Sequence, residues 1–383
     1  MANLDVIEVL DGGLYTTVQD LGRYGFQRYG VPVSGAMDTY ALRIGNILLG
    51  NPDNAAAIEI TLVGPKLKFL ADTSIVLSGA DLTAHLDQKT VPTHEVFTVR
   101  RGSLLAFEGP MVGSRAYLAV AGGIHVPLVM GSASTYTRSN LGGLEGRTLL
   151  AGDHLLVKEG GRSDPNSFLQ APPEFVPIYD HEYELRVVMG PQQDSFTHQG
   201  TTTFLGSTYT VSQHSDRVGY RLMGPTIQHK KGADIISDGV PFGAVQITGD
   251  GLPVILMADR GTTGGYTKIA AVIAVDIPKI AQALPGDKIT FKAITIQKAH
   301  ELLIAQEDGL QHLKKLVKEA GQKLPSKPRV TVNGEAFEVC DEEGRLLTQT
   351  NVLNGRTRSS RNIVRATVKG TNYTFEVEVV QPQ

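Results

Sequence analysis

Residues 16–38 read T-T-V-Q-D-L-G-R-Y-G-F-Q-R-Y-G-V-P-V-S-G-A-M-D and combine glycine with carboxylates, arginines, Gln19 and Ser34. Glycine inside a helix costs about 1 kcal/mol relative to alanine, so this stretch predicts a set of loops. Polar side chains beside glycine often build a site for an anion or a planar carbonyl group. A simple glycine-rich connection between strands is the alternative, and spacing alone does not decide between them.

A helix is expected directly after this stretch. Apolar residues recur at helical spacing from Met37 to Leu48, and the pattern stops at Gly50-Asn51-Pro52. The helix is expected to begin near Ser34 or Asp38. Ser34 could then cap it, and free backbone amides would face the loop above.

Length and composition predict a multidomain protein of a reducing compartment. A chain of 383 residues is long enough for two or three domains. Its net charge of -3 supplies no basic field, so nucleic acid is not expected as a partner. Cys340 is the single cysteine and cannot form an internal disulfide, and the acidic N-terminus lacks the pattern of an export signal. These features favour a cytoplasmic location.

Residues 116–137 contain no Asp, Glu, Lys or Arg, which raises the question of a membrane span. Glycine, proline, serine and threonine interrupt this apolar run. The interruptions favour a buried strand followed by a loop, so no membrane partner is expected.

Short strands and tight turns dominate most of the chain. Gly102-Ser103, Gly152-Asp153 and Gly286-Asp287 each separate two apolar runs, and the last two turns predict equivalent strands that close two separate barrels. Gln19-Asp20…Arg23-Tyr24-Gly25 also resembles Ser215-Asp216-Arg217…Gly219-Tyr220-Arg221, which hints at an internal duplication.

The pattern divides the chain into four parts. Residues 160–177 are rich in Gly, Pro and Ser and read as a linker, and a second β-rich domain follows. Residues 297–320 predict a helix, interrupted at Asp308-Gly309 and closed by Gly321. The tail from Arg329 predicts a small β module with Asn-Gly and Lys-Gly turns. The predicted parts are 1–165, 166–296, 297–324 and 328–383.

Several familiar catalytic motifs are absent from the sequence. It contains no P-loop, no dinucleotide fingerprint, no H-E-x-x-H and no C-x-x-C, and its histidines lack metal-ligand spacing, so no bound metal is predicted. Ser34 is not inside G-x-S-x-G, which favours capping or ligand hydrogen bonding over a nucleophilic role.

Polar clusters on glycine-rich loops remain as candidate sites. Arg115 either neutralises a buried carboxylate such as Glu59 or binds an anionic ligand, and Arg138 lies on a long loop where an arginine is less often a packing device. Residues 215–217 and 259–266 both place acid, base and hydroxyl groups beside glycine.

These motifs resemble a known family. T-T-V-Q-D-L-G-R-x-G with G-V-P-x-S-G-A-M-D, then G-S-R-A-Y-L-A-V-A-G-G-I, S-D-R-V-G-Y-R-L-M-G-P and T-T-G-G-Y-T-K-I-A, are similar to allophanate hydrolase subunit 2, also called KipA/PxpC. That family resembles subdomains A and B of the carboxyltransferase domain of urea carboxylase. The likeness runs in order from about Val6 to Phe291.

The resemblance implies a mainly β fold with two tandem cyclophilin-like β-barrels and a few short helices. It implies a KipI/PxpB-type partner that supplies the other half of the site. With a third, LamB/YcsF-type protein, such subunits act as an ATP-dependent 5-oxoprolinase that opens 5-oxoproline to glutamate. ATP is thus expected at the level of the complex, with a small amide or lactam as substrate.

Two departures from the family pattern and one feature of the tail qualify the resemblance. The family reads D-R-Q-T-T-G-G-Y-P-K-I-A, whereas Gly261 here replaces the Gln and Thr267 the Pro. The loop therefore lacks the side-chain amide that the family pattern has at position 261. The tail begins like the first strand of a biotin-carrier domain, yet no M-K-M follows, so no biotinylated lysine is expected.

Lactam opening and carboxyl transfer both develop negative charge on an amide or ureido oxygen, which needs N–H groups and cations. Asp20 and Asp216 are candidates for proton transfer, although salt bridges to Arg are equally open to them, and Arg217 is the third predicted catalytic residue. Arg217 or Arg260 could hold a phosphate, so Arg260 is the predicted cofactor contact. The predicted substrate contacts are Gln19, Arg23, Ser34, Arg115, Arg138, Thr262, Thr263 and Tyr266.

The expected site is a cavity shared by the glycine-lined mouths of two barrels and completed by another polypeptide. Two alternatives stay open beside the oxoprolinase. One is a biotin-dependent carboxyltransferase acting on urea or a similar amide. The other is a non-catalytic protein that binds a KipI-like kinase inhibitor.

Overall fold

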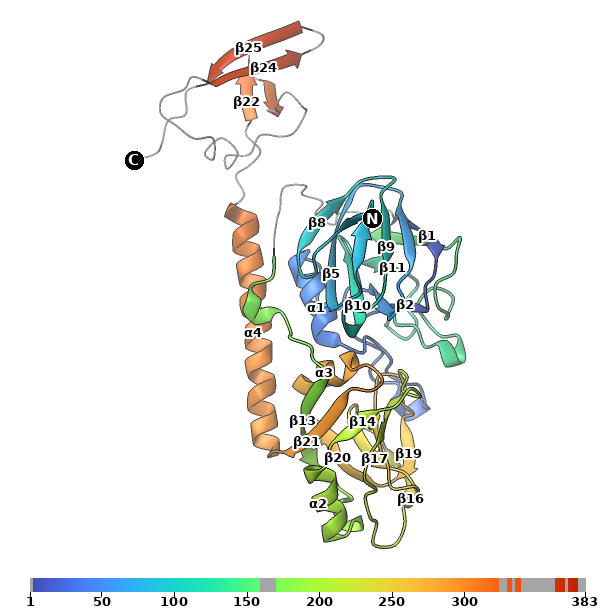
Figure 1. Cartoon of the computed structure of the whole chain (residues 1–383). Helices are drawn as coiled ribbons and strands as arrows, with labels where there is room; N and C mark the ends of the chain where they lie inside the picture. The colour runs from blue at the N-terminus through green and yellow to red at the C-terminus, as the bar shows by residue number, and fades with distance from the viewer. Residues whose placement is uncertain are drawn as a thin grey trace, which may run out of the picture. The chain divides into compact units, whose positions relative to one another are not determined.

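The computed structural model describes residues 3–158, 170–323, 329–332, 335–338, 362–368 and 371–377. The chain divides into two compact units, Met1–Val317 and Lys318–Gln383. The first unit contains two β-rich halves, residues 3–158 and 170–293, called here the first and second half (Figure 1). Part of the predicted 160–177 linker, the boundary at 325–328 and Cys340 lie outside the described residues.

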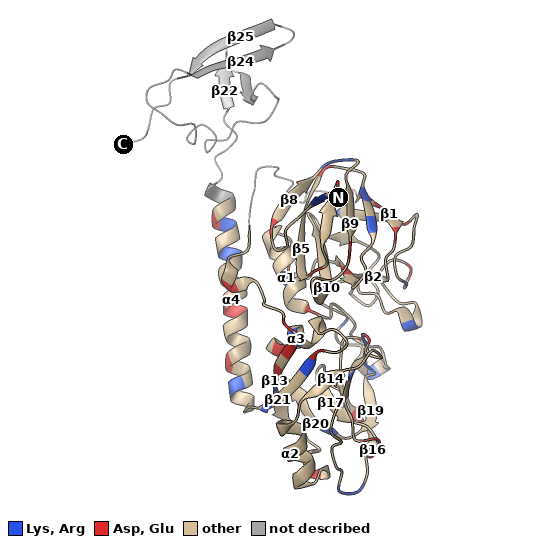
Figure 2. Ribbon diagram, viewed as in Figure 1, with Lys and Arg blue, Asp and Glu red and all other residues tan. Residues whose placement is uncertain are grey.

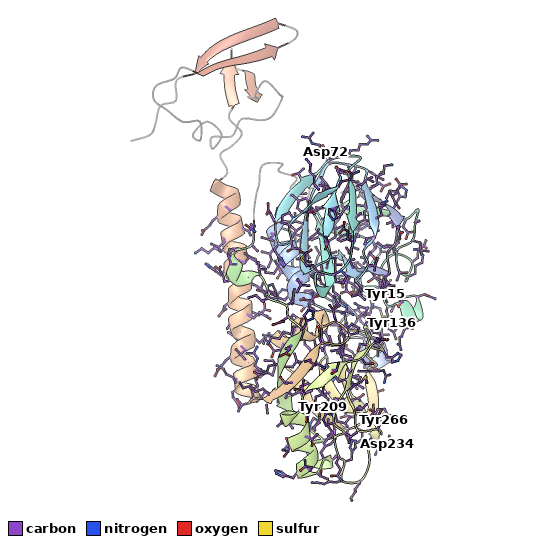
Figure 3. All side chains as sticks on the ribbon, in the orientation of Figure 1. Tyr15, Asp72, Tyr136, Tyr209, Asp234 and Tyr266 are labelled. Carbon is purple, nitrogen blue, oxygen red and sulfur yellow. The ribbon has the colours of Figure 1, made fainter. Side chains whose placement is uncertain are left out.

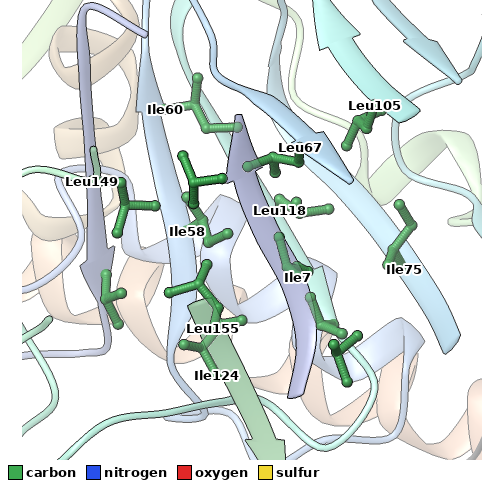
Figure 4. Packing of buried hydrophobic residues seen from close by; sticks show 14 of the residues in the cluster. Ile7, Ile58, Ile60, Leu67, Ile75, Leu105, Leu118, Ile124, Leu149 and Leu155 are labelled. Atoms are coloured by element: carbon green, nitrogen blue, oxygen red, sulfur yellow. The ribbon is translucent and has the colours of Figure 1, made fainter. Parts of the chain in front are cut away.

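The first half consists of two sheets around one hydrophobic core. Ile7, Ile58, Leu67 and Leu118 meet in this core and are fully buried (Figure 4). Successive side chains along a strand point to opposite faces, so Ile58 and Leu118 face this core, while Ala57 and Ala119 pack into a second apolar cluster on the other face of the smaller sheet. The larger sheet has the order β11 (Ile124–His125), β12 (His154–Lys158), β1 (Asn3–Asp11), β4 (Lys66–Phe69), β9 (Leu104–Phe107), β6 (Ala84–Leu86) and β7 (Lys89–Thr90). The smaller has the order β2 (Tyr15–Gln19), β3 (Ala57–Thr61), β10 (Val112–Val120), β5 (Thr73–Asp81) and β8 (Val96–Val99).

The second half forms a closed barrel. Its order is β13 (Glu182–Met189), β20 (Lys268–Val272), β17 (Ala244–Ile247), β18 (Pro253–Leu256), β15 (Gly219–Met223), β14 (Tyr209–Val211) and β21 (Lys288–Ala293). β21 pairs parallel to β13 and antiparallel to β14, which closes the barrel as predicted for the strand after Gly286-Asp287. β16 (Asp234–Gly239) and β19 (Thr263–Tyr266) pair in a separate two-stranded arm.

The mainly β fold with few helices is confirmed. The helices of the first unit are α1 (Thr39–Leu48), α2 (His198–Gly206), α3 (Ile277–Gln282) and most of α4 (Ile296–Lys323). Short 3-10 turns are η1 (Gln27–Tyr29), η2 (Thr137–Ser139), η3 (Pro173–Phe175), η4 (Gln193–Ser195) and η5 (Ala274–Asp276). Acidic and basic residues are interspersed over both halves and along α4 (Figure 2).

Two expectations around the helices are wrong. α1 is capped by Asp38, whose Oδ1 accepts from the backbone N–H of Ala41 at 2.9 Å, so Ser34 is not the cap. α4 runs without a break through Gly309, where Phe175 packs within 3.7 Å of the position of an added Cβ. Packing of Leu310 and Leu313 into the first unit therefore outweighs the weak helical propensity of this glycine.

The start of the glycine-rich stretch is a strand rather than a loop. Residues 16–19 belong to β2, which pairs antiparallel with β3. Residues 20–38 form the loops predicted, apart from the short turn η1. β10 confirms the buried strand predicted for the uncharged run, and no helix among the described residues is long and apolar enough to cross a membrane.

The second unit contains two hairpins among its described residues. β22 (Arg329–Val332) pairs with β23 (Glu335–Glu338), and β24 (Asn362–Val368) pairs with β25 (Thr371–Val377). Both pairings are antiparallel, as predicted for the tail. The predicted Asn-Gly and Lys-Gly turns lie outside the described residues.

Equivalent turns support the suggested duplication. The Asp153 Oδ2 accepts from Leu150 N at 2.8 Å, and the Asp287 Oδ2 accepts from Leu284 N at 2.7 Å. In the same way, Asp20 Oδ1 and Asp216 Oδ1 each accept from the backbone N–H two residues later, both at 2.8 Å. The two halves therefore use the same side-chain-to-backbone turns at corresponding places.

Candidate functional site

A cavity of about 380 Å³ lies on the outer face of the closed barrel. Its floor crosses the neighbouring strands β15, β18 and β17. Strand alternation turns Tyr220 and Ile255 into the barrel core, and turns Gly219, Arg221 and Leu256 outward to the cavity. Val254, Gln246 and Thr248 complete the floor.

The walls of the cavity come from three separate parts of the first unit. His214, Asp216 and Val218 belong to the loop before β15, Tyr266 ends β19, and Arg138 reaches over from η2 of the first half. Arg138 Nη2 donates to Asp216 Oδ2 at 3.0 Å, and both side chains are more than half exposed. The cavity therefore brings together three of the predicted residues, Arg138, Asp216 and Tyr266.

Gly264 gives the cavity its shape beside Tyr266. Gln246 lies next to it, nine-tenths buried, and its Nε2 donates to the carbonyl of Tyr266 at 3.5 Å. A Cβ at Gly264 would come within 2.5 Å of that Nε2, so a larger residue would displace the amide from its present position. Figure 3 shows Tyr266 beside Asp234, its partner in β16.

Arg217 does not face this cavity. Its guanidinium is buried at the junction of the two halves, where Nε and Nη2 donate to Asp259 at 2.9 and 3.1 Å, Nη2 to Gly35 O at 2.7 Å, and Nη1 to Glu59. Burial alone would lower the pKa of Arg217, but the carboxylates of Asp259 and Glu59 outweigh it and the pKa is raised. The prediction of a catalytic, phosphate-holding Arg217 is therefore corrected to a role in joining the halves.

Arg115 crosses the junction in the opposite direction. It is buried on β10, and its Nη1 donates to Tyr220 Oη and to Ala281 O of the second half, both at 2.5 Å. The predicted pairing of Arg115 with Glu59 is not formed, because Glu59 is bonded instead by Arg217, by Tyr117 Oη at 2.7 Å and by the N–H of Met37 at 2.8 Å.

Asp20 is a buried acceptor within the first half. Its carboxylate accepts from Gly22 N at 2.8 Å, Ser132 Oγ at 2.6 Å, Ala133 N at 2.7 Å and also from Ser134 Oγ. Four donors leave little capacity for proton transfer, which corrects the predicted catalytic role. The carboxylate fixes the loop 132–135 instead.

Three further predicted contacts are buried, and two of them are bonded to the same loop. Gln19 Nε2 donates to Thr135 O at 3.1 Å, and Arg23 Nη2 donates to Ser134 O. Ser34 has φ 56° and donates its backbone N–H to Ala258 O at 3.2 Å. Arg23 Nε and Nη1, Gln19 Oε1 and Ser34 Oγ have no hydrogen-bond partner among the described residues, and burial lowers the pKa of Arg23. None of these three residues lines the cavity.

Arg260, Thr262 and Thr263 belong to the segment leading into β19. Arg260 donates to the carbonyls of Val240 at 2.9 Å and Met257 at 3.1 Å, lies over the Phe242 ring, and has its pKa lowered by burial. Thr262 O accepts from Val240 N at 3.1 Å, and Thr263 pairs with Gly239. Arg260 therefore braces its own loop, which corrects its assignment to a phosphate.

Thr267, which stands where the family has proline, has a structural role. Its N–H donates to Ala233 O at 2.9 Å, a bond that proline cannot form. Its Oγ1 lies 3.0 Å from His229 Nε2. The departure thus adds contacts to the arm of β16 and β19.

The predicted residues therefore separate into four places: the cavity, the junction, the loops of the first half and the segment that leads into β19. The expectation of one cleft between two barrel mouths is wrong for Asp20, Arg115 and Arg217. Sequence reasoning missed His214, Arg221, Gln246 and Thr248. Period-two alternation from Gly219 could have placed Arg221 on the outer face. No group of three or more His, Cys, Asp or Glu within the described ranges is arranged to hold a metal.

Comparison with known proteins identifies the family of this chain. The family model "Carboxyltransferase domain, subdomain A and B" matches residues 29–293. The chain belongs to this carboxyltransferase A/B family.

Individual relatives agree with this assignment. The chain is 37% identical over 314 residues to the C subunit of 5-oxoprolinase from Haemophilus influenzae, covering 82% of this chain and 99% of that protein. It is 38% identical over 311 residues to the corresponding 5-oxoprolinase protein of Escherichia coli, covering 81% of this chain and 97% of that protein. The solved structure of the K. lactis urea amidolyase superposes with a TM-score of 0.77 and 33% identity, over 82% of this chain and 20% of that one.

Proposed function

We propose that this chain is a subunit of an ATP-dependent 5-oxoprolinase that opens 5-oxoproline to L-glutamate. The observation that carries the proposal is the match to two 5-oxoprolinase proteins over 97% and 99% of their length. The urea amidolyase, in contrast, is matched over a fifth of its chain. Both 5-oxoprolinase relatives are named as one subunit of several, so we propose partners of the KipI/PxpB and LamB/YcsF types and a cytoplasmic location.

The cavity offers the groups that lactam opening requires. Negative charge develops on the lactam oxygen as water attacks its carbonyl carbon and the C–N bond breaks. Arg138 lines the cavity and can stabilise that charge, while Asp216 lies 3.0 Å from Arg138 and can accept or deliver a proton. Val254 and Leu256 give apolar walls for the ring methylenes.

ATP is assigned to the complex as a whole. An unstrained lactam is a poor electrophile, so we propose that its oxygen takes the γ-phosphoryl group of ATP and releases ADP. Water then adds to the carbonyl carbon, the C–N bond breaks as the ring nitrogen takes a proton, and a second water hydrolyses the resulting acyl phosphate to glutamate and phosphate. The Arg260 and Arg217 guanidiniums already donate to carbonyls and carboxylates of this chain. We therefore assign no phosphate to these two residues.

The test is a three-protein assay. Purified partners of the two types are mixed with ATP and 5-oxoproline, with and without this chain, and glutamate and ADP are measured. We expect ATP-dependent glutamate formation only when the chain is present. Equal rates of glutamate formation with and without the chain would refute the proposal.

Family membership and the urea amidolyase match support a second candidate, the carboxyltransferase component of a biotin-dependent urea carboxylase. This function requires a biotinylated carrier and a biotin carboxylase from other proteins. Transfer of carboxylate from the carboxylated carrier to urea, dependent on this chain, would favour it over the oxoprolinase.

A further inference from the structure

The two arginines that line the cavity differ in their carboxylate partners. Arg138 is paired with Asp216 at 3.0 Å, which leaves that carboxylate engaged. Arg221 also lines the cavity and is exposed, yet its guanidinium forms no salt bridge among the residues that the structure describes. One cation of the lining therefore has no carboxylate in contact with it.

Asp250 is an acidic residue that interacts electrostatically with Arg221. Its Oδ1 accepts from Thr248 Oγ1 and from Leu252 N at 3.2 Å, so it is held in its own turn. The hydrogen bond from Thr248 is the main cause that lowers the pKa of Asp250, and the positive charge of Arg221 lowers this pKa further. Asp250 therefore partly offsets the positive charge of Arg221 but forms no salt bridge with its guanidinium.

The rest of the lining suits an amide of small size. Gln246 presents a carboxamide, a group that carries both a donor and an acceptor and can pair with the N–H and C=O of another amide. Val218, Val254 and Leu256 supply apolar contact beside it. A guanidinium such as that of Arg221 binds a carboxylate through two parallel hydrogen bonds.

We infer that the cavity binds a small amide bearing one carboxylate, and that Arg221 selects for this carboxylate. The inference rests on the proposed function only for the choice of 5-oxoproline as the probe. It excludes urea as a good ligand, since urea has no carboxylate to meet Arg221.

Direct binding to the full chain tests the inference. Binding of 5-oxoproline and of 2-pyrrolidinone, which is the same lactam without the carboxylate, is measured by calorimetry or ligand-observed NMR. We expect 2-pyrrolidinone to bind about tenfold more weakly or worse, as expected for loss of a charge-assisted hydrogen bond. Arg221→Gln should weaken 5-oxoproline by a similar factor and leave 2-pyrrolidinone unchanged, while Arg221→Lys should retain part of the selectivity.

The matched control is Arg101→Gln, an exposed arginine on the turn between β8 and β9 that does not line the cavity. It should bind 5-oxoproline like the wild type. Equal binding of both lactams, wild-type binding by Arg221→Gln, or no saturable binding of 5-oxoproline to the full chain would each overturn the inference.

The outcomes also separate this inference from the proposed function. Glutamate formation that needs the chain but is indifferent to Arg221→Gln defeats the inference alone. Carboxylate-selective binding without glutamate formation in the assembled mixture defeats the proposed function alone.

Discussion

Arg217 and Glu59 form a buried ion pair that joins the two β-rich halves of the chain. Glu59 lies on β3 of the first half, and Arg217 precedes β15 of the second. Asp259 binds the same guanidinium at 2.9 Å, and both carboxylates are almost completely buried. The geometry of the cavity depends on this junction, because Arg138 reaches the cavity from the first half.

Arg217→Met should destabilise the fold strongly. It leaves two carboxylates buried without their cation, and removal of one partner of a buried pair costs about 3–5 kcal/mol. Urea denaturation followed by circular dichroism measures the loss. Arg101→Met is the exposed control, and an Arg217→Met midpoint equal to that of the control would contradict the structural role.

Gly264→Ala should damage the cavity without unfolding the barrel. The added methyl would lie 2.5 Å from Gln246 Nε2 and push this amide or Tyr266 out of place. We expect at least a tenfold loss of 5-oxoproline affinity, roughly the effect of one displaced hydrogen-bonding group.

Gly239→Ala on the same arm is the matched control for Gly264→Ala. No atom lies within 4 Å of the position of its Cβ. It should bind 5-oxoproline like the wild type. If the two variants bind equally well, Gly264 has no part in shaping the site.

His94 should make the fold sensitive to acid. It is buried, its Nε2 accepts from Gly79 N at 3.3 Å, and burial lowers its pKa to about 4 from 6.5. The unfolded chain therefore takes up this proton first as the pH falls. The stabilisation is complete above pH 6.5 and is lost between pH 6.5 and 4, by about 3 kcal/mol.

His94→Gln retains an acceptor for Gly79 but cannot titrate. The free energy of unfolding, measured by urea titration at intervals from pH 7 to 4, should fall less steeply in this variant. His300→Gln, on the exposed side of α4, should keep the wild-type slope. Parallel pH profiles for wild type and His94→Gln would rule out His94 as the source.

The spacing of apolar residues and of glycine turns predicted much of this fold. The opening strand, the first helix, the uncharged strand and the barrel-closing strand after Gly286-Asp287 are all present. The continuity of α4 was not predictable, because it depends on the packing of Phe175 against Gly309 from a distant part of the chain.

The candidate site was predicted only in part. Arg138, Asp216 and Tyr266 stand beside glycine turns, where polar residues are conspicuous in a sequence. Arg221 and Gln246 lie on strands and become neighbours only through barrel pairing. Arg115 and Arg217 looked like ligand contacts because their true partners, Ala281 and Glu59, are more than a hundred residues away.

Arg138→Gln separates function from stability. Its exposed pair with Asp216 contributes at most about 1 kcal/mol to folding. We expect its unfolding midpoint to stay close to that of the wild type. Loss of the cation that faces the lactam oxygen should nevertheless lower turnover in the assembled complex about tenfold or more.

The decisive measurement is the rate of ATP-dependent glutamate formation when this chain is added back to its two partners. The rate should rise from background with wild-type chain, rise to a comparable plateau with Arg101→Gln, and stay at least about tenfold lower with Arg138→Gln. A rate that is the same without the chain, or the same with Arg138→Gln as with wild type, would contradict a 5-oxoprolinase component whose substrate site is this cavity.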